Sequence, residues 1–264
     1  MAVNNQDSNA LRVIFGPAVE DLHNPDRVQA KNDLEKFGSA LNETNHWSIL
    51  SEKSLVLEVG NDSWPFPIPL LKDQAGWYFD TETGKDEILN RRIGKNELAT
   101  LATVRAYVAA QREYASRDRD NDGVLEYAQK IKSAPDTHDG LFWPPEDGEI
   151  SPLGPLVADA QEQGYRFHKP GEEPPPFQGY YFKILTEQGK HAPGGKYNYI
   201  INGNMIGGFG LVAWPADYGD TGIMTFIVNQ QGIVYQKDLG EKTEKIAPKI
   251  KAYDPDSSWK VSKE

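Results

Sequence analysis

Alternating carboxylates next to a glycine form the most specific chemical pattern in this sequence. Asp118, Asp120 and Asp122 alternate, Gly123 follows directly, and Glu126 comes shortly after. Alternate side chains of a tight loop can converge on one point, where a hard cation such as calcium takes about six to eight oxygen ligands. The pattern predicts a bound calcium ion, or a similar cation, rather than a reaction.

The spacing resembles an EF-hand loop that starts at Asp118, with one defect. The seventh residue, Val124, would offer its carbonyl, the eighth, Leu125, would point into a core, and the twelfth is Gln129 instead of a bidentate glutamate. A neutral amide is the poorer ligand, so a structural ion is favoured over a calcium sensor. The competing interpretation is a solvated acidic turn. The predicted metal ligands are Asp118, Asp120, Asp122, Val124, Glu126 and Gln129.

Histidines near carboxylates are the residues that could catalyse a hydrolysis. His138 and Asp139 lie in the loop 135–143, and His191 lies in the glycine-rich segment 189–195. A histidine titrates near neutral pH and can act as a general base beside a carboxylate. These three residues are therefore the catalytic candidates, although neighbours in sequence seldom point at the same substrate.

The usual catalytic and nucleotide-binding motifs are absent from the sequence. It has no His-Glu-x-x-His pair, no Gly-x-Ser-x-Gly elbow, no phosphate-binding loop and no dinucleotide fingerprint. The sequence therefore favours a non-catalytic protein over an enzyme.

Aromatic residues crowd the loop-rich second half of the chain. Such rings can stack on sugars, grip a peptide or pack a loop onto a sheet. The candidate binding surface consists of Trp143, Tyr165, Phe177, Tyr180 and Tyr197.

Composition excludes several classes of function. The chain of 264 residues has a net charge of −11 and no cysteine, so a thiol nucleophile, a disulfide and a cysteine-based zinc site are impossible. An acidic chain without a basic cluster is not expected to bind nucleic acid. No apolar run approaches the roughly 20 residues that span a bilayer, and the polar start has no signal-peptide region. We expect either a cytosolic protein or a mature chain whose leader has been removed.

The elements that position these residues predict an α+β protein in three parts. These are an N-terminal α+β subdomain over 1–95, a linking helix, acidic loop and helix over 96–132, and a loop-rich C-terminal antiparallel-sheet domain over 133–264.

The first part should place helices on a small antiparallel sheet. Hydrophobic periodicity predicts a helix that breaks at Gly16 and Pro17, then a second helix over 26–41, followed by a strand meander. The segment 64–70 alternates apolar residues with prolines, which remove N–H donors from one side of a strand. It should therefore be an edge strand.

The linking part should be helical on both sides of the acidic loop. A short helix over 85–93 is expected to close at Gly94, and a longer one runs from about Asn96, as its cap, to Ser116. A further helix over 125–131 would complete the helix–loop–helix context of an ion clip.

The last part should form a four-stranded antiparallel sheet after a loop-rich stretch. A terminal helix, interrupted at Pro248, is expected over residues 243–253. The predicted strands cover residues 180–185, 209–214, 224–228 and 232–237.

A series of short motifs, in order along nearly the whole chain, carries a family resemblance. They are WPFPIP (64–69), RRIGKNE (91–97), QREYA (111–115), GLFWP (140–144), SPLGP (151–155), APGG (192–195), MIGGF (205–209) and KDLG (237–240). They resemble an uncharacterised family of exported bacterial proteins, a domain of unknown function. The resemblance implies a bacterial source and export to the periplasm or envelope, and it implies no activity. Members of that family start with a leader and a further helix, which implies a trimmed chain here.

A second resemblance is confined to residues 177–240. Its motifs are GYYF (179–182), AWP (213–215), YGDTG (218–222), TFIV (225–228) and GIVY (232–235). They are similar to the globular heads of type IV pilins and pseudopilins, which are antiparallel sheets packed on a helix, some of which bind calcium. The first half is similar to a cystatin-type α+β cone. These likenesses speak to fold alone.

Together these patterns predict a non-catalytic exported protein, periplasmic or secreted, that does not span a membrane. It would bind an envelope protein or an envelope polymer through the loop-rich face of its second half, with one calcium ion as a structural clip. The alternative is a hydrolase that acts on envelope glycan or peptide through a histidine and a carboxylate.

Overall fold

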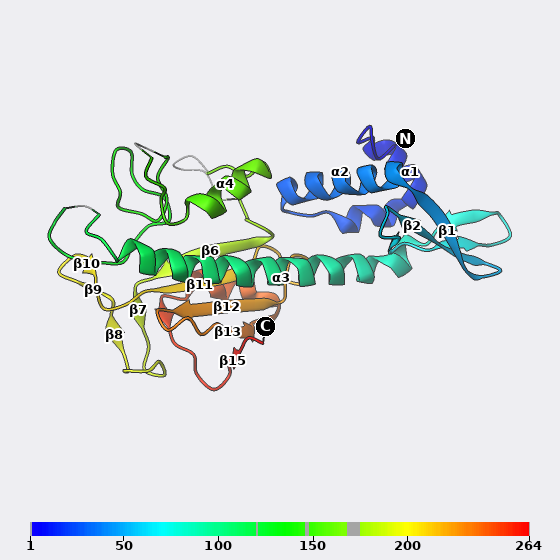
Figure 1. Cartoon of the computed structure of the whole chain (residues 1–264). Coiled ribbons are helices and arrows are strands. Elements are labelled where there is room, and N and C mark those ends of the chain that lie inside the picture. The colour runs from blue at the N-terminus through cyan, green and yellow to red at the C-terminus, as the bar shows by residue number, and fades with distance from the viewer. Residues whose placement is uncertain (1, 120, 146–147, 168–174, 264) are drawn as a thin grey trace. The chain divides into compact units, whose positions relative to one another are not determined.

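The protein is an α+β chain that divides into two compact units. The computed structural model describes residues 2–119, 121–145, 148–167 and 175–263. The units are Met1–Gly94 and Lys95–Glu264, and the long helix α3 (Thr81–Tyr114) contributes residues to both (Figure 1). Helices accompany an antiparallel sheet in the first unit, and a five-stranded antiparallel sheet forms the second, so the predicted α+β class is confirmed. Within the described ranges, no helix is long and apolar enough to cross a membrane.

The N-terminal unit begins with two helices whose limits follow from local sequence. α1 (Ser8–Phe15) ends at Gly16, whose φ of +75° is readily adopted only by glycine, and the 3-10 helix η1 (Pro17–Leu22) follows. α2 (Arg27–Glu43) begins after Asp26, whose carboxylate accepts a backbone N–H of the first turn. The predicted break and the predicted second helix are both confirmed.

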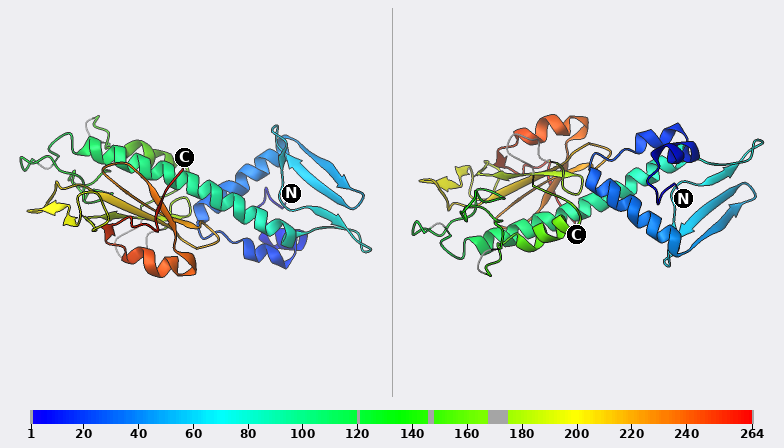
Figure 2. Two further views of the ribbon diagram at one scale, coloured as in Figure 1. Left: turned by 90° about the horizontal axis from the view of Figure 1, so that it is seen from below. Right: turned by 90° about the horizontal axis from the view of Figure 1, so that it is seen from above.

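The sheet of the N-terminal unit is antiparallel, in the order β1-β2-β4-β5, with β3 beside the end of β2. Its strands are β1 (Asn45–Ser51), β2 (Ser54–Val59), β3 (Trp64–Pro65), β4 (Leu70–Lys72) and β5 (Trp77–Phe79). The hairpin β1–β2 extends away from the helices of this unit (Figure 2). An aromatic cluster holds helices and sheet together, with neighbouring ring centroids 4.9 to 6.4 Å apart. Its members are Phe15, Phe37, Trp47, Trp64, Phe66 and Phe79.

The proline-rich segment 64–70 is not the continuous edge strand that its alternation predicted. It forms only the short β3 and then bends before β4, because alternate prolines leave too few donors for a ladder. Phe66 N still donates to Leu57 O at 2.7 Å. Ile68 is buried against α3, where a Cβ on Gly84 would lie 2.7 Å from the Ile68 Cα. The bend therefore serves to seat Ile68 on the helix.

Gly94 does not separate two helices as predicted, because α3 runs through it without interruption. One glycine costs a helix only about 1 kcal/mol relative to alanine, and good helix formers flank it here. Asn96 is not a cap: it is fully buried, and its side-chain amide donates to Thr221 O at 2.9 Å. In sequence, a buried polar anchor such as Asn96 looks the same as a helix cap.

The predicted helix over 125–131 is also absent. Tyr127 forms an antiparallel bridge with Met205, and its N–H donates to the Met205 carbonyl at 2.9 Å. The side chain of Gln111 on α3 binds both the N–H and the C=O of Ala128. These tertiary partners take the backbone groups that a helix would have used.

The C-terminal unit carries a fully antiparallel sheet in the order β15-β13-β12-β11-β6. Its strands are β6 (Tyr180–Leu185), β11 (Gly210–Pro215), β12 (Met224–Asn229), β13 (Tyr235–Asp238) and β15 (Lys260–Val261). Three of the four predicted strands are confirmed to within one residue, whereas the fourth begins at Tyr235 instead of residue 232. β15 is an additional edge strand too short to show in a hydrophobic pattern.

Smaller elements surround this sheet. The predicted terminal helix is broken into short pieces and ends in a strand, because Pro248 interrupts it. The smaller elements are α4 (Gly154–Glu162), β7 (Glu187–Gln188), β8 (Tyr197–Asn198), β9 (Ile200–Ile201), β10 (Asn204–Met205), η2 (Gly240–Lys242), α5 (Thr243–Ile246), η3 (Ala247–Lys249) and β14 (Ala252–Tyr253).

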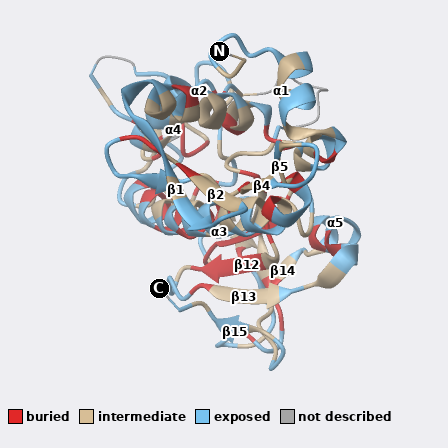
Figure 3. Ribbon diagram, turned by 90° about the vertical axis from the view of Figure 1, so that its right-hand side faces the viewer, coloured by how far each residue is buried: buried red, intermediate tan, exposed pale blue. Residues whose placement is uncertain are grey.

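The central strands β11 and β12 are buried on both faces, which Figure 3 shows in red for β12. Successive side chains of a strand point to opposite faces. Leu211 accordingly joins the core that includes Val104 of α3, whereas Val212 joins a second core with Ala247 and Tyr253. The continuous apolar runs of these strands reflect this double burial.

Polar side chains of α3 are fastened to the sheet backbone. Glu97 accepts the N–H groups of Ile223 and Met224 at 3.0 and 2.9 Å. Tyr107 donates its hydroxyl to Gly210 O at 3.0 Å. Burial raises the pKa of Tyr107, so the hydroxyl stays a neutral donor.

Replacing Gln111 by alanine should destabilise the C-terminal unit by about 3 kcal/mol, because it orphans the buried N–H and C=O of Ala128. Urea unfolding followed by circular dichroism measures the change. The control is Glu113→Ala, an exposed position on the same helix, which should change stability by less than about 0.5 kcal/mol. Equal stability of the two variants would contradict the anchor.

Candidate functional site

The described part of the acidic loop is closed by its own backbone. The Asp118 carboxylate accepts the N–H groups of Asn121 and Gly123 at 2.8 and 2.9 Å, and the Asp122 carboxylate accepts that of Val124 at 2.8 Å. These are local side-chain-to-backbone turns of the kind aspartate favours. The solvated-turn interpretation therefore accounts for these contacts without an ion.

Three of the predicted ligands also fasten the loop to the β9–β10 hairpin. The contacts are Asn204 Nδ2 to Asp122 Oδ2 at 2.6 Å, Met205 N to Glu126 Oε2 at 2.8 Å, and Gln129 Nε2 to Gly203 O at 2.7 Å. This bond gives a structural reason for glutamine instead of the EF-hand glutamate at position 129, because an amide can donate to a carbonyl and a carboxylate cannot.

The described acids do not make a metal site by themselves. Among the residues that the structure describes, no group of three or more His, Asp or Glu side chains is arranged to hold a metal ion, so Asp118, Asp122 and Glu126 are not such a group. Asp120, the remaining carboxylate of the predicted set, lies outside the described residues. The EF-hand interpretation of Leu125 is wrong, because this side chain is 60% exposed instead of pointing into a core.

His138 and Asp139 are neighbours whose side chains have different partners. The His138 ring stacks on Trp143 with centroids 4.3 Å apart. The Asp139 carboxylate pairs with Lys130 and accepts the N–H of Ala134 at 2.9 Å. Burial alone would raise the pKa of Asp139, but these hydrogen bonds outweigh it and lower the pKa. Both residues hold the loop 132–142 in shape.

His191 does meet a carboxylate. Its Nδ1 lies 3.1 Å from Asp254 Oδ1, and its backbone N–H donates to the same oxygen at 2.8 Å. The pair sits on the surface, with side chains 42% and 34% exposed. Gly189 lies against the Asp254 carboxylate, where a Cβ would come within 2.1 Å of Asp254 Cγ. The arrangement orients an imidazole, but solvent reaches both groups.

Trp143, a predicted binding residue, is a buried part of the fold. Its side chain is 2% exposed, and the guanidinium of Arg119 lies 5.4 Å from its ring. Arg119 is itself buried and pairs with Glu149 at 2.5 Å. Such a cation over an aromatic face joins two loops of the unit.

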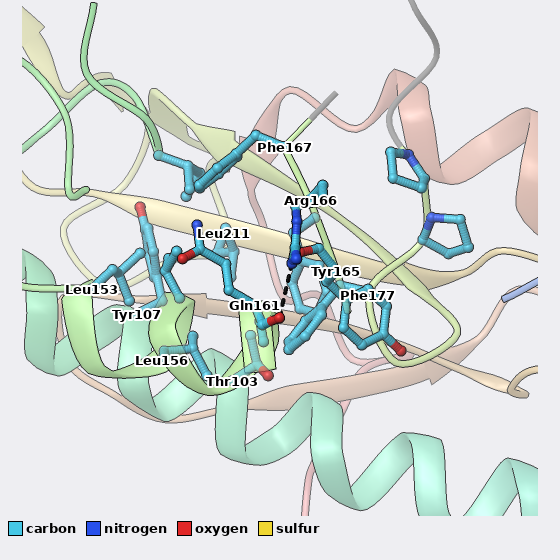
Figure 4. Close-up of a pocket in the computed structure, with 16 residues that line it drawn as sticks. Thr103, Tyr107, Leu153, Leu156, Gln161, Tyr165, Arg166, Phe167, Phe177 and Leu211 are labelled. Carbon is cyan, nitrogen blue, oxygen red and sulfur yellow. Dashed lines mark hydrogen bonds between the residues drawn. The ribbon is translucent and has the colours of Figure 1, made fainter. Parts of the chain in front are cut away.

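An apolar pocket of about 210 Å³ lies in the C-terminal unit, between α4, the sheet and the chain that follows α4 (Figure 4). Tyr107 of α3 and Leu211 of β11 form part of its wall. Leu156 and Val157 of α4 contribute aliphatic side chains. The remaining lining residues are Thr103, Ile131, Leu153, Ala160, Gln161, Tyr165, Arg166, Phe167, Pro175, Pro176, Phe177 and Phe182.

The polar side chains that line the pocket are few. Arg166 is exposed, and its Nη1 donates to the carbonyls of Gln161 and Tyr165 at 2.8 and 2.7 Å, the first of which is dashed in Figure 4. The ring of Tyr165 lies edge-on to that of Phe177, with centroids 4.9 Å apart. The pocket is thus an aromatic-walled hollow with the cation of Arg166 in its lining.

The structure divides the five predicted binding residues. Tyr165 and Phe177 line the pocket. Trp143 and Tyr180 are buried, and the Tyr180 hydroxyl donates to Met224 O at 3.0 Å. Tyr197 lies on β8, half-exposed and away from the lining set.

Sequence reasoning missed the part of the pocket that α4 supplies. Leu156, Val157 and Ala160 recur at helical spacing, which marks one face of an amphipathic helix. The surrounding prolines and glycines had suggested loop over this stretch. Leu153, on the same side, belongs to the adjacent core.

The calcium ion stays a prediction, and a thermal melt tests it. If the acidic loop binds the ion in the folded state only, the midpoint should rise by several degrees with free calcium and fall with chelator, by mass action. The variant Asp120→Ala should lose this dependence and keep its fold. Asp159→Ala, an exposed acid on α4, is the control and should keep it. Identical melts of the wild type with calcium and with chelator would contradict the ion.

Comparison with known families assigns this chain to a family whose function is unknown. The family model described as protein of unknown function (DUF2950) matches residues 1–262. No curated protein and no solved structure gives a match. The predicted likeness to pilin heads is therefore not shown, whereas the resemblance to a domain of unknown function is. On this match over nearly its full length, the chain belongs to the DUF2950 family.

Proposed function

We propose that this protein is a non-catalytic binding protein whose C-terminal unit takes up an apolar side chain of a protein partner. The pocket beside α4 is the single observation that carries the proposal. It is largely lined by aliphatic and aromatic side chains. When an apolar group displaces water from such a lining, the free energy falls, which favours binding.

The size of the pocket favours part of a large molecule over a whole small one. Its volume of about 210 Å³ is below the roughly 300–1,000 Å³ of pockets that enclose small-molecule ligands. One large side chain projecting from a peptide fits such a space. Binding of this kind concentrates its energy in a buried anchor, with weaker contacts around it.

The chemistry of the lining favours a protein partner over an envelope polymer. A glycan presents hydroxyl groups that need hydrogen-bond partners, and leaving them unpaired in an apolar hollow is costly. The cation of Arg166 and the amide of Gln161, both exposed, could instead bond the backbone carbonyls that flank an anchor residue. Location in the bacterial envelope, with calcium as a structural clip, belongs to the same proposal and rests on the sequence motifs.

Selection of random displayed peptides on the immobilised protein tests this function. Enriched peptides should share a large apolar residue. The variant Ala160→Trp, which fills the pocket, should weaken them at least about tenfold, a loss of about 1.4 kcal/mol. The control is Ala158→Trp, the same change on the exposed side of α4, and should bind as the wild type does. Peptides that bind both variants equally, or no enrichment, would refute the pocket as the binding site.

A hydrolase is the second candidate, favoured by the His191–Asp254 contact. A carboxylate bonded to Nδ1 can orient a histidine whose Nε2 acts as a general base toward water. The exposure of both side chains argues against it, because catalytic groups work best where water is excluded.

Release of soluble fragments from purified peptidoglycan and from casein decides between the two candidates. A binding protein should release nothing above a blank, and His191→Ala should then be indistinguishable from the wild type. Activity that His191→Ala abolishes, while His138→Ala retains it, would establish the hydrolase instead.

A further inference from the structure

The strand β1 presents an open edge without an acid, a lysine or an arginine. All but one of its residues are exposed, and its side chains include Trp47 at 44%, Ile49 at 77% and Leu50 at 65% exposure. Figure 3 shows β1 in the colour of exposed residues. A row of unpaired N–H and C=O groups on such a strand is a template for another strand.

The other edge strands in the described part of the chain carry the devices that prevent pairing. β3 has Pro65, β5 is only three residues long, and β6 has Lys183 in its middle. β15 is a two-residue strand that begins with Lys260, and the remaining edge strands, β8, β9, β10 and β14, are also only two residues long. Short length, proline and lysine all blunt an edge. β1, with seven residues from Asn45 to Ser51, has none of these three, and its ladder irregularity lies near its end, between Ile49 and Ser51.

The ladder shows which backbone groups of β1 face outward. Leu57 O accepts from Phe66 N on the far side of β2, so the backbone groups of Leu57 point away from β1. Its partner Trp47 is therefore in a non-hydrogen-bonded pair, and the N–H and C=O of Trp47 point to the open edge. By the same alternation the groups of Ile49, the partner of Leu55, also point outward.

We infer that two copies of this chain pair antiparallel through β1, about a twofold axis at Ser48. In that register, Trp47 of one copy lies opposite Ile49 of the other, and their outward backbone groups bond each other. Aromatic and β-branched residues are a favourable cross-strand pair. A twofold axis repeats the pair on the other side of Ser48, so one strand supplies both halves of the interface.

The edge suits a second copy of this chain better than an unrelated strand. No residue from Asn45 to Ser51 is an acid, a lysine or an arginine, although the whole chain has a net charge of −11. Copies therefore meet where like charges do not repel. The irregularity in the ladder falls between Ile49 and Ser51, outside the central pairs. His46 and Ser48 bind Glu58 on the face of the sheet opposite to Trp47. This carboxylate therefore has its partners within each copy.

Cysteine cross-linking of the full chain tests the register, and the absence of native cysteine makes the readout clean. At Ser48 the two Cα atoms should be about 4.5 Å apart, as in a non-hydrogen-bonded pair, which is within disulfide reach. Ser48→Cys should therefore form a disulfide dimer under mild oxidation. The control is Ser51→Cys. In the same register the two copies of residue 51 are six residues apart along the paired strands, about 20 Å, so this variant should stay monomeric. Equal cross-linking at both positions, or none at Ser48, would overturn the pairing.

Sedimentation of the protein without cysteine tests the association itself. The wild type should show a concentration-dependent dimer, because a single strand pair buries little surface and binds weakly. Ile49→Lys should abolish the dimer by placing a charge at the centre of the edge. Val13→Lys, which changes a side chain 85% exposed on α1, should leave it intact. A wild type that remains monomeric at the highest soluble concentration, or an unchanged dimer in Ile49→Lys, would refute the inference.

Discussion

The structure of the C-terminal unit depends on the hydrogen bonds that buried and partly buried polar side chains of α3 make to backbone outside the helix. Glu97, Tyr107 and Gln111 each bind main-chain groups of another segment. A buried polar group without a partner costs more than a typical hydrogen bond contributes, so these contacts permit few alternative registers. Apolar side chains could tolerate a shift of the helix, whereas these three could not. The helix is therefore placed by direction-specific bonds and held by apolar burial.

That placement determines the candidate binding site. Tyr107 forms part of the pocket wall with its ring while its hydroxyl is bound to Gly210 O, so the wall is rigid on the helix side. α4 and the aromatic residues after it supply the other side. The Arg166 guanidinium bonds carbonyls of its own segment and braces that side. Because hydrogen bonds hold both walls, the proposed pocket would take up an apolar side chain without reorganisation of the core.

The sequence predicted what periodicity controls and missed what tertiary contacts control. β11 and β12 were recognisable because both their faces are buried, and α1 and α2 because of helical spacing and a Gly-Pro break. The predicted helix end at Gly94 was wrong, because a single glycine does not end a helix when the residues on both sides favour helix. The predicted helix over 125–131 was wrong because Met205 and Gln111 bond the backbone groups that this helix would need. The pocket has no motif: its walls come from distant segments, none of which has a chemical signature alone.

The proposed pocket binding and the inferred strand pairing would use two different kinds of recognition. In the pocket, apolar burial would supply the affinity, and the shape of the hollow would select one side chain from many. At the β1 edge, backbone groups would supply the bonds, and every strand has such groups, so selection must come from charge and side-chain register. The lack of acids, lysines and arginines from Asn45 to Ser51 would admit an identical strand, and the inferred pairing of Trp47 with Ile49 of a second copy would restrict it to one register.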